Sequence, residues 1–270
     1  MTHERIEYKP RDWTKTPLLG KQILEFEELT RLEGLPSAAG EILARRGIFV
    51  THICEPKETF ETLSDQPVLV IAEHPQHDLD GIAVLSGLPK ERDDTFVLAS
   101  AGFLGFPPHL KEHIIPIYAT AKKETNSLRL KIWRGLKLDP PPPPDSKRRN
   151  LESLEKAAQA INNEHIVVIF PEAANGSWQS GLAFLAKRVL NTEVRIVFAS
   201  IYGTDALDKW RILPQAKLLL PPTNVALSFS MPYLFSDFTQ LSQGLKGMVV
   251  KMKDEYDQFK EESKARLRLS

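Results

Sequence analysis

The chain of 270 residues contains a single cysteine, Cys54, which excludes an internal disulfide and a cysteine-based zinc ribbon. Neither charge is in excess, since 35 Lys and Arg face 35 Asp and Glu, so we expect no nucleic-acid partner. No apolar run reaches the roughly 18–20 residues of a membrane-spanning helix, and the first residues lack the apolar core of a signal peptide. We therefore expect a cytoplasmic protein, with membrane contact limited to the periphery of the inner face.

Short apolar runs alternate with helical patterns along most of the chain. The runs that predict strands are 47–53, 67–72, 95–100, 113–119, 165–170, 193–203, 217–220 and 225–230. The patterns that predict helices are 17–46, 81–88, 151–163, 181–190 and 240–267. This alternation favours a single α/β domain with a mostly parallel central sheet flanked by helices. We expect an N-terminal helical extension over 1–46 and the α/β domain over 47–270.

A basic and proline-rich insertion at about 121–149 interrupts the alternation. It contains nine Lys and Arg against three acidic residues, and apolar residues interleave with the basic ones over 128–138. Five prolines follow at 140–144 and predict a stiff polyproline spacer. One interpretation is a peripheral membrane anchor with basic residues on lipid headgroups. The other is a surface element whose apolar residues pack on the domain beneath.

The first chemical motif follows the apolar run 67–72. It contains two histidines and two aspartates, His74, His77, Asp78 and Asp80, and then a second apolar run. This pattern predicts a buried strand, a polar turn and a helix. Ligands of open α/β sheets bind at the carboxyl ends of strands, so the cluster is a candidate general base with its carboxylate partner, or a metal site.

The second motif follows the most hydrophobic run, 165–170. Pro171 and Glu172 come directly after it, and a small-residue turn follows with Asn175, Gly176 and Ser177. A glutamate in this position can bind hydroxyl groups, and such a turn can present backbone N–H groups to a phosphate. Taken alone, the motif fits equally well a strand-ending turn that caps the next helix.

Together the two motifs resemble the glycerolipid acyltransferase superfamily, typified by 1-acylglycerol-3-phosphate acyltransferases. In that family one strand ends in Asn-His with an Asp after four further residues, and a later strand ends in Phe-Pro-Glu-Gly-Thr-Arg-Ser. The corresponding stretches here are 68–85 and 162–177. The blocks 95–119 and 180–203 match the family's other elements, so the resemblance runs in order over about 47–203.

The resemblance implies transfer of a fatty acyl group to a hydroxyl of a glycerophospholipid-type acceptor. Acyl-CoA or acyl carrier protein would be the co-substrate, with no other cofactor and no metal, and the partner would be a lysophospholipid-like acceptor. His74 would be the general base and Asp80 its partner. The acceptor would be bound by Glu172 and its neighbours, namely Pro171, Asn175, Gly176 and Ser177.

The sequence departs from the family pattern at several positions. His74 and Asp80 are separated by five residues instead of four, and Glu73 replaces the usual Asn. Ala-Ala-Asn at 173–175 replaces Gly-Thr-Arg, so the family's phosphate-binding arginine is missing. Lys122 and Lys123 are our candidates to replace it, with 147–149 as a further option. The acceptor accordingly stays open, an ornithine or aminoalcohol lipid included.

Besides acyltransferases, two other classes of protein fit parts of the pattern, namely metal-dependent hydrolases and non-catalytic lipid-binding proteins. The spacing of His74, Asp78 and Asp80 resembles the manganese-binding first motif of DHH phosphoesterases, and His-Pro after a strand resembles zinc-dependent sugar deacetylases. His109 and His113, four residues apart, are candidates to complete such a metal site. A non-catalytic lipid-binding protein, in which the His/Asp cluster is a hydrogen-bonded turn, is the third class.

Overall fold

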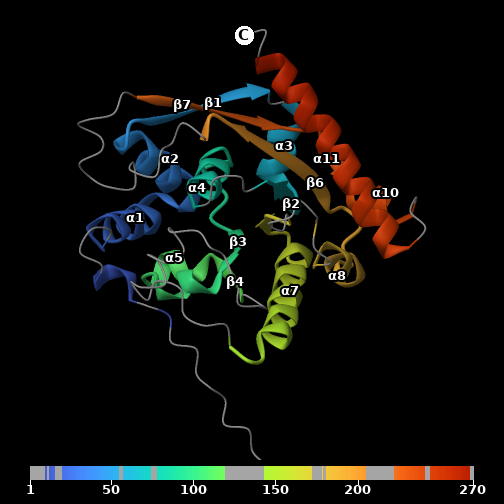
Figure 1. Ribbon diagram of the computed structural model, residues 1–270, viewed down its shortest axis with the longest axis horizontal. Coiled ribbons are helices and arrows are strands. Elements are labelled where there is room, and N and C mark those ends of the chain that lie inside the picture. The colour runs from blue at the N-terminus through green and yellow to red at the C-terminus, as the bar shows by residue number, and fades with distance from the viewer. Residues whose placement is uncertain are drawn as a thin grey trace, which may run out of the picture.

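The computed structural model describes residues 10, 12–15, 20–54, 57–73, 78–118, 143–171, 178, 181–204, 222–240 and 244–267 (Figure 1). Its strands are β1 (Ile48–Cys54), β2 (Val68–Ala72), β3 (Thr95–Ser100), β4 (Ile114–Ile117), β5 (Ile166–Ile169), β6 (Arg195–Tyr202), β7 (Thr223–Phe229) and β8 (Tyr233–Leu234). Its α-helices are α1 (Gly20–Glu33), α2 (Leu35–Arg45), α3 (Lys57–Asp65), α4 (Asp78–Ser86), α5 (Pro108–Glu112), α7 (Ser146–Asn162), α8 (Gly181–Arg188), α10 (Phe235–Gln240) and α11 (Leu245–Leu267). Two short 3-10 helices are η1 (Trp13–Lys15) and η2 (Ala101–Gly105).

The described strands form one sheet in the order β1-β7-β6-β2-β5-β3-β4, with β8 paired to β6. The strands β6, β2, β5, β3 and β4 run parallel, whereas β7 is antiparallel to β6. In the centre, β2 lies between β5 and β6, and all five of its residues are buried. Such continuous burial requires a strand without polar alternation, which Val-Leu-Val-Ile-Ala provides.

Helices cover both faces of the sheet. Val68, Val70 and Ala72 of β2 point to one face, where α1, α2 and α4 pack, and α5 lies on the same side (Figure 1). Leu69 and Ile71 point to the other face, which α7, α8, α10 and α11 cover. The period of two in a strand thus divides one apolar run between two separate cores. The predicted α/β domain with a mostly parallel sheet and an N-terminal helical segment is confirmed.

Several predicted boundaries were wrong. The helix expected to begin at residue 81 begins at Asp78, so residues 78–80 are helical and not part of a polar turn. The helix expected from 151 begins at Ser146, within the segment assigned to the basic insertion, and α3 was not predicted. The final helix expected over 240–267 is α11, which begins at Leu245, and the short helix α10 before it was not predicted. The strand expected at 217–220 lies outside the described residues.

Arg92 ties together the edge of the sheet at which β5 and β3 begin. Its guanidinium group pairs with Asp94 at 2.7 Å and is largely buried. It also donates to backbone carbonyls at the ends of two helices, those of Leu63, Ser64, Gln66 and Glu164. The last carbonyl groups of a helix have no partner within the helix, and the guanidinium group of Arg92 donates hydrogen bonds to several of them. Arg92 therefore stabilises this edge of the sheet.

Within the described part of the chain, no helix is both long enough and apolar enough to cross a membrane.

Candidate functional site

The two predicted motifs leave the sheet side by side. Strands β2 and β5 are parallel neighbours in the register Val68↔Ile166 to Ile71↔Ile169. Glu73 follows β2, and Phe170 and Pro171 follow β5. Because parallel neighbours end at the same edge, the residues after β2 and β5 share one carboxyl edge, the usual location of ligand sites in open α/β sheets.

Asp80 is the third residue of α4 and is fully buried. Leu79 and Ala83 on the same helix belong to the core beneath the sheet, which pulls the first turn of α4 inward. A negative charge in the first turn of a helix is favoured by the helix dipole. A buried carboxylate is costly unless it is hydrogen bonded or paired, so the fold holds this group in a defined environment.

The first turn of α4 also packs against the second motif. A Cβ atom added at Gly81 would lie 3.7 Å from Cζ of Phe170, an ordinary van der Waals distance. Phe170 itself packs on the core that contains β2 and α4. The segment after β5 and the helix that carries Asp80 are therefore in direct contact.

Glu73, the residue before His74, is held by α11. Its Oε1 accepts a hydrogen bond from Nζ of Lys260 at 2.7 Å, its Oε2 lies 2.6 Å from the same ammonium group in an ion pair, and only 16% of its side chain is exposed. Its backbone N–H donates to the hydroxyl of Tyr256 at 3.2 Å, and this hydroxyl donates to the carbonyl of Ala199 on β6 at 3.1 Å. A helix near the end of the chain thus fixes the point where β2 ends.

Tyr256 is fully buried among aromatic side chains. Burial, with the negative charge of Glu73 as a second cause, holds the pKa of its hydroxyl well above the ordinary value of 10.0. The hydroxyl therefore keeps its proton and remains a hydrogen-bond donor at neutral pH. The indole ring of Trp178 lies against the Tyr256 ring, with centroids 5.5 Å apart. Tyr256 thus contacts the chain just before the first motif's histidine and just after the second motif's turn.

Most of the predicted site residues lie outside the described residues. Those residues are His74, His77, Lys122, Lys123, Glu172, Asn175, Gly176 and Ser177. Pro171 is described and buried directly after β5. Of the other basic candidates, Arg148 and Arg149 both pair with Asp145, and Arg149 also lies over the ring of Tyr118.

The residues proposed to complete a metal site do not converge where they are described. His113 ends α5, and its Nδ1 lies 2.8 Å from the backbone carbonyl of Thr95. His109 lies on the exposed side of the same short helix, 4.0 Å from Glu112. No group of three or more His, Cys, Asp or Glu within the described ranges is arranged to hold a metal ion. The side chains of His74 and Asp78 lie outside those ranges.

A solved structure has a similar architecture. It is the crystal structure of the 1-acyl-sn-glycerophosphate (LPA) acyltransferase, PlsC, from Thermotoga maritima, with a TM-score of 0.50. The alignment has 15% sequence identity and covers 90% of this chain and 95% of that chain. The two chains share a fold. No protein-family model and no curated protein matches the sequence.

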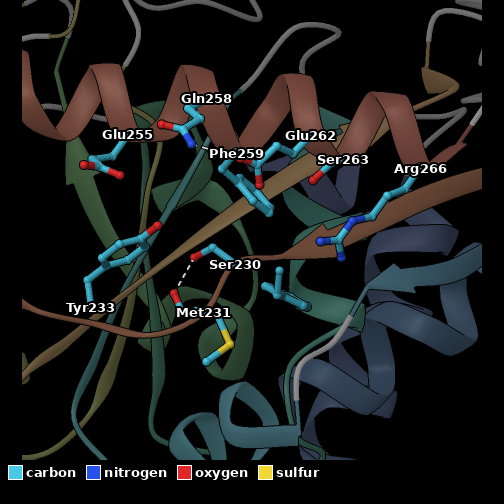
Figure 2. A pocket seen from close by; sticks show the side chains of 10 residues that line it. Ser230, Met231, Tyr233, Glu255, Gln258, Phe259, Glu262, Ser263 and Arg266 are labelled. Atoms are coloured by element: carbon cyan, nitrogen blue, oxygen red, sulfur yellow. Dashed lines mark hydrogen bonds between the residues drawn. The ribbon is translucent and has the colours of Figure 1, made fainter.

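A groove of about 130 Å³ lies outside this carboxyl edge, between the segment after β7 and α11 (Figure 2). Its polar lining includes Glu255, Glu262 and Arg266 from α11, and Glu255 lies nearest to Tyr233 in Figure 2. Because β7 is antiparallel to β6, the segment after β7 runs toward the opposite edge of the sheet. None of the predicted site residues lines this groove.

Sequence reasoning missed Tyr256 and Lys260. Both lie in the region predicted as a final amphipathic helix, and a tyrosine and a lysine on such a helix carry no functional signal of their own. Their contacts join residues 183 and 187 positions apart in the chain, and only the folded chain reveals them.

Proposed function

We propose that the protein transfers a fatty acyl group from an acyl thioester, of coenzyme A or acyl carrier protein, to a hydroxyl group of a glycerophospholipid-type acceptor. The observation that carries this proposal is the convergence of the two motifs. Their strands are parallel neighbours, and Phe170 of the second motif packs on the core to which the first motif's Leu79 belongs. The fold shared with a lysophosphatidate acyltransferase supports the same class of reaction.

In the proposed reaction, His74 removes the proton of the acceptor hydroxyl as its oxygen attacks the thioester carbonyl. Asp80 fixes the tautomer of the imidazole and stabilises the imidazolium that forms. The tetrahedral intermediate then expels the thiolate, which takes the proton from His74, so that an ester and a free thiol are the products. No covalent enzyme intermediate is needed.

Acceptor binding is assigned to the turn after β5. Glu172 would accept hydrogen bonds from acceptor hydroxyl groups, and the backbone of 175–177 would donate to a phosphate. Lys122 and Lys123 would add positive charge that the missing arginine supplies in the family pattern. The burial of Asp80 supports its role as the orienting carboxylate, because an orienting group must not exchange with solvent.

The test is an acyl-transfer assay on purified protein with EDTA present. Palmitoyl-CoA is the donor, lysophosphatidate the acceptor, and released thiol and lipid product are both measured. We expect thiol release that depends on the acceptor and falls in Asp80→Asn and Glu172→Gln. Thiol release without an acceptor would indicate a thioesterase. Loss of activity on chelation, restored by manganese or zinc, would favour the metal hydrolase instead.

A further inference from the structure

The hydroxyl of Tyr256 takes the place of a strand-to-strand hydrogen bond at the end of β2. Ala72, the last residue of β2, is paired with Ala199 on β6. At the next residue, the N–H of Glu73 and the carbonyl of Ala199 are joined through the Tyr256 hydroxyl. The phenol thus lies between the two strands, and it sets the direction in which the chain leaves the sheet toward His74.

Lys260 holds the side chain of the same residue. Its ammonium group contacts both carboxylate oxygens of Glu73, one helical turn beyond Tyr256. The backbone of Lys260 is itself anchored, because its carbonyl accepts a hydrogen bond from the hydroxyl of Tyr202 on β6. The ion pair therefore joins Glu73 to a helix that is itself bonded to β6 through the hydroxyl of Tyr202.

The ring of Tyr256 extends this contact to the second motif. Trp178 follows residues 172–177 in the chain and packs its indole ring on the phenol ring. One buried side chain therefore contacts the chain on both sides of the proposed catalytic edge.

We propose that Tyr256 and Lys260 are positioning residues that hold His74 and the turn after β5 in register for acyl transfer. This inference rests on the proposed function. Neither residue needs to touch substrate, since both act through Glu73 and Trp178. The unusual glutamate before the histidine has a defined partner on α11 in this arrangement.

The ion pair also sets the charge next to the base. Glu73 is covalently adjacent to His74, and Lys260 neutralises its carboxylate. Among the residues that the structure describes, the titratable groups near this pair include the phenols of Tyr202 and Tyr256 and the carboxylate of Glu261. Removing the ammonium group leaves a negative charge on the residue before His74, and a negative charge near an imidazole favours its protonated form.

The test compares three variants with a matched control. Lys260→Met keeps the apolar stem and removes the ion pair, and Tyr256→Phe keeps the ring and removes the hydroxyl. The double variant with Glu73→Gln and Lys260→Met removes both charges. Lys253→Met is the control, because Lys253 forms an ion pair with Asp257 on the same helix, away from Glu73. Thermal unfolding of each variant establishes that it is folded.

Two measurements are made on each variant: kcat and KM as a function of pH, and the NMR titration of the imidazole assigned by its absence in His74→Gln. In Lys260→Met we expect kcat to fall roughly 10- to 100-fold with KM for the donor within about twofold. We expect its His74 titration to move up by about half a pH unit, and the double variant to return it. Tyr256→Phe lowers kcat without moving the titration.

The result that overturns the inference is Lys260→Met behaving like Lys253→Met in both kcat and the His74 titration. If acyl transfer depends on His74 while Lys260→Met changes nothing, the positioning role fails and the proposed function stands. If the wild type transfers no acyl group but the titration still moves, the proposed function fails and the coupling of Lys260 to residue 74 stands.

Discussion

Replacing Tyr256 by Phe removes one oxygen atom from a fully buried position. The ring remains, so its packing against Trp178 and Phe198 is preserved. What is lost is the bridge between the N–H of Glu73 and the carbonyl of Ala199. Both backbone groups lie at the end of a buried strand, where water cannot readily replace the hydroxyl.

The magnitude follows from these two orphaned groups. A buried polar group left without its partner costs about 1–3 kcal/mol, and a small gain from the less polar ring offsets part of the sum. We therefore expect Tyr256→Phe to lower the free energy of unfolding by about 2–4 kcal/mol. A loss of this size is a large fraction of the stability of an ordinary domain.

Urea unfolding measures this loss, and the slope of the transition should be unchanged because the surface exposed on unfolding is the same. Tyr233→Phe is the control, since Tyr233 belongs to the same aromatic cluster and its hydroxyl bonds to no described residue. We expect the control to change stability by less than about 0.5 kcal/mol. Equal stability of the two variants would refute the bridging role.

The raised pKa of Tyr256 adds a dependence on alkaline pH. Below about pH 10 the phenol is protonated in both states, so its contribution to stability is fully present. Above this pH the unfolded chain releases the proton and the folded protein retains it. The free energy of unfolding then falls by about 1.4 kcal/mol per pH unit until the folded pKa is reached. Tyr256→Phe should lack this component, and an identical alkaline slope in both proteins would contradict it.

Three further predictions concern the scaffold. Gly87→Ala should destabilise by about 1–3 kcal/mol in urea unfolding, because the new Cβ would lie 2.3 Å from Cδ2 of the buried Leu227. Ser228→Ala should leave stability unchanged or raise it by up to about 1 kcal/mol, since its buried hydroxyl bonds to no described group, and a clear loss would disprove this. Burial is the largest single influence on Asp94 and acts to raise its pKa, but the hydrogen bond and positive charge of Arg92, with the hydrogen bond from His165, together outweigh it and the pKa lies below the ordinary 3.8. Asp94 therefore contributes stability above about pH 4 that is lost as pH falls through its folded pKa, and Asp94→Asn should flatten this acid limb.

The sequence predicted most strands well because they are short apolar runs, and the central β2 and β5 are buried throughout. The run at 95–100 matches β3 residue for residue, and β2 differs from its prediction by one position. The helix α3 was not predicted because Lys57–Asp65 is short and has only two apolar residues, Phe60 and Leu63. The antiparallel direction of β7 and its insertion between β1 and β6 depend on tertiary pairing, which periodicity does not encode.

The two motifs of the candidate site could be predicted from the sequence, but the contacts that α11 makes with Glu73 could not. Strand ends followed by His, Asp and Glu predict a ligand site from sequence alone, and the roles of Asp80 and Pro171 in it stay predictions. The shift of α4 to begin at Asp78 came from Leu79, whose burial draws the first turn into the core. The contact of Glu73 with Lys260 depends on which face of α11 packs against the sheet. The sequence alone does not show which face that is, so this contact could not be predicted.

We propose that His74 is the general base of acyl transfer. The most direct measurement is the acceptor-dependent rate with palmitoyl-CoA and lysophosphatidate, in EDTA, for His74→Ala and His77→Ala side by side. We predict a loss of about 10²- to 10⁴-fold in kcat for His74→Ala and a change within about twofold for His77→Ala. Equal rates in the two variants would contradict the account.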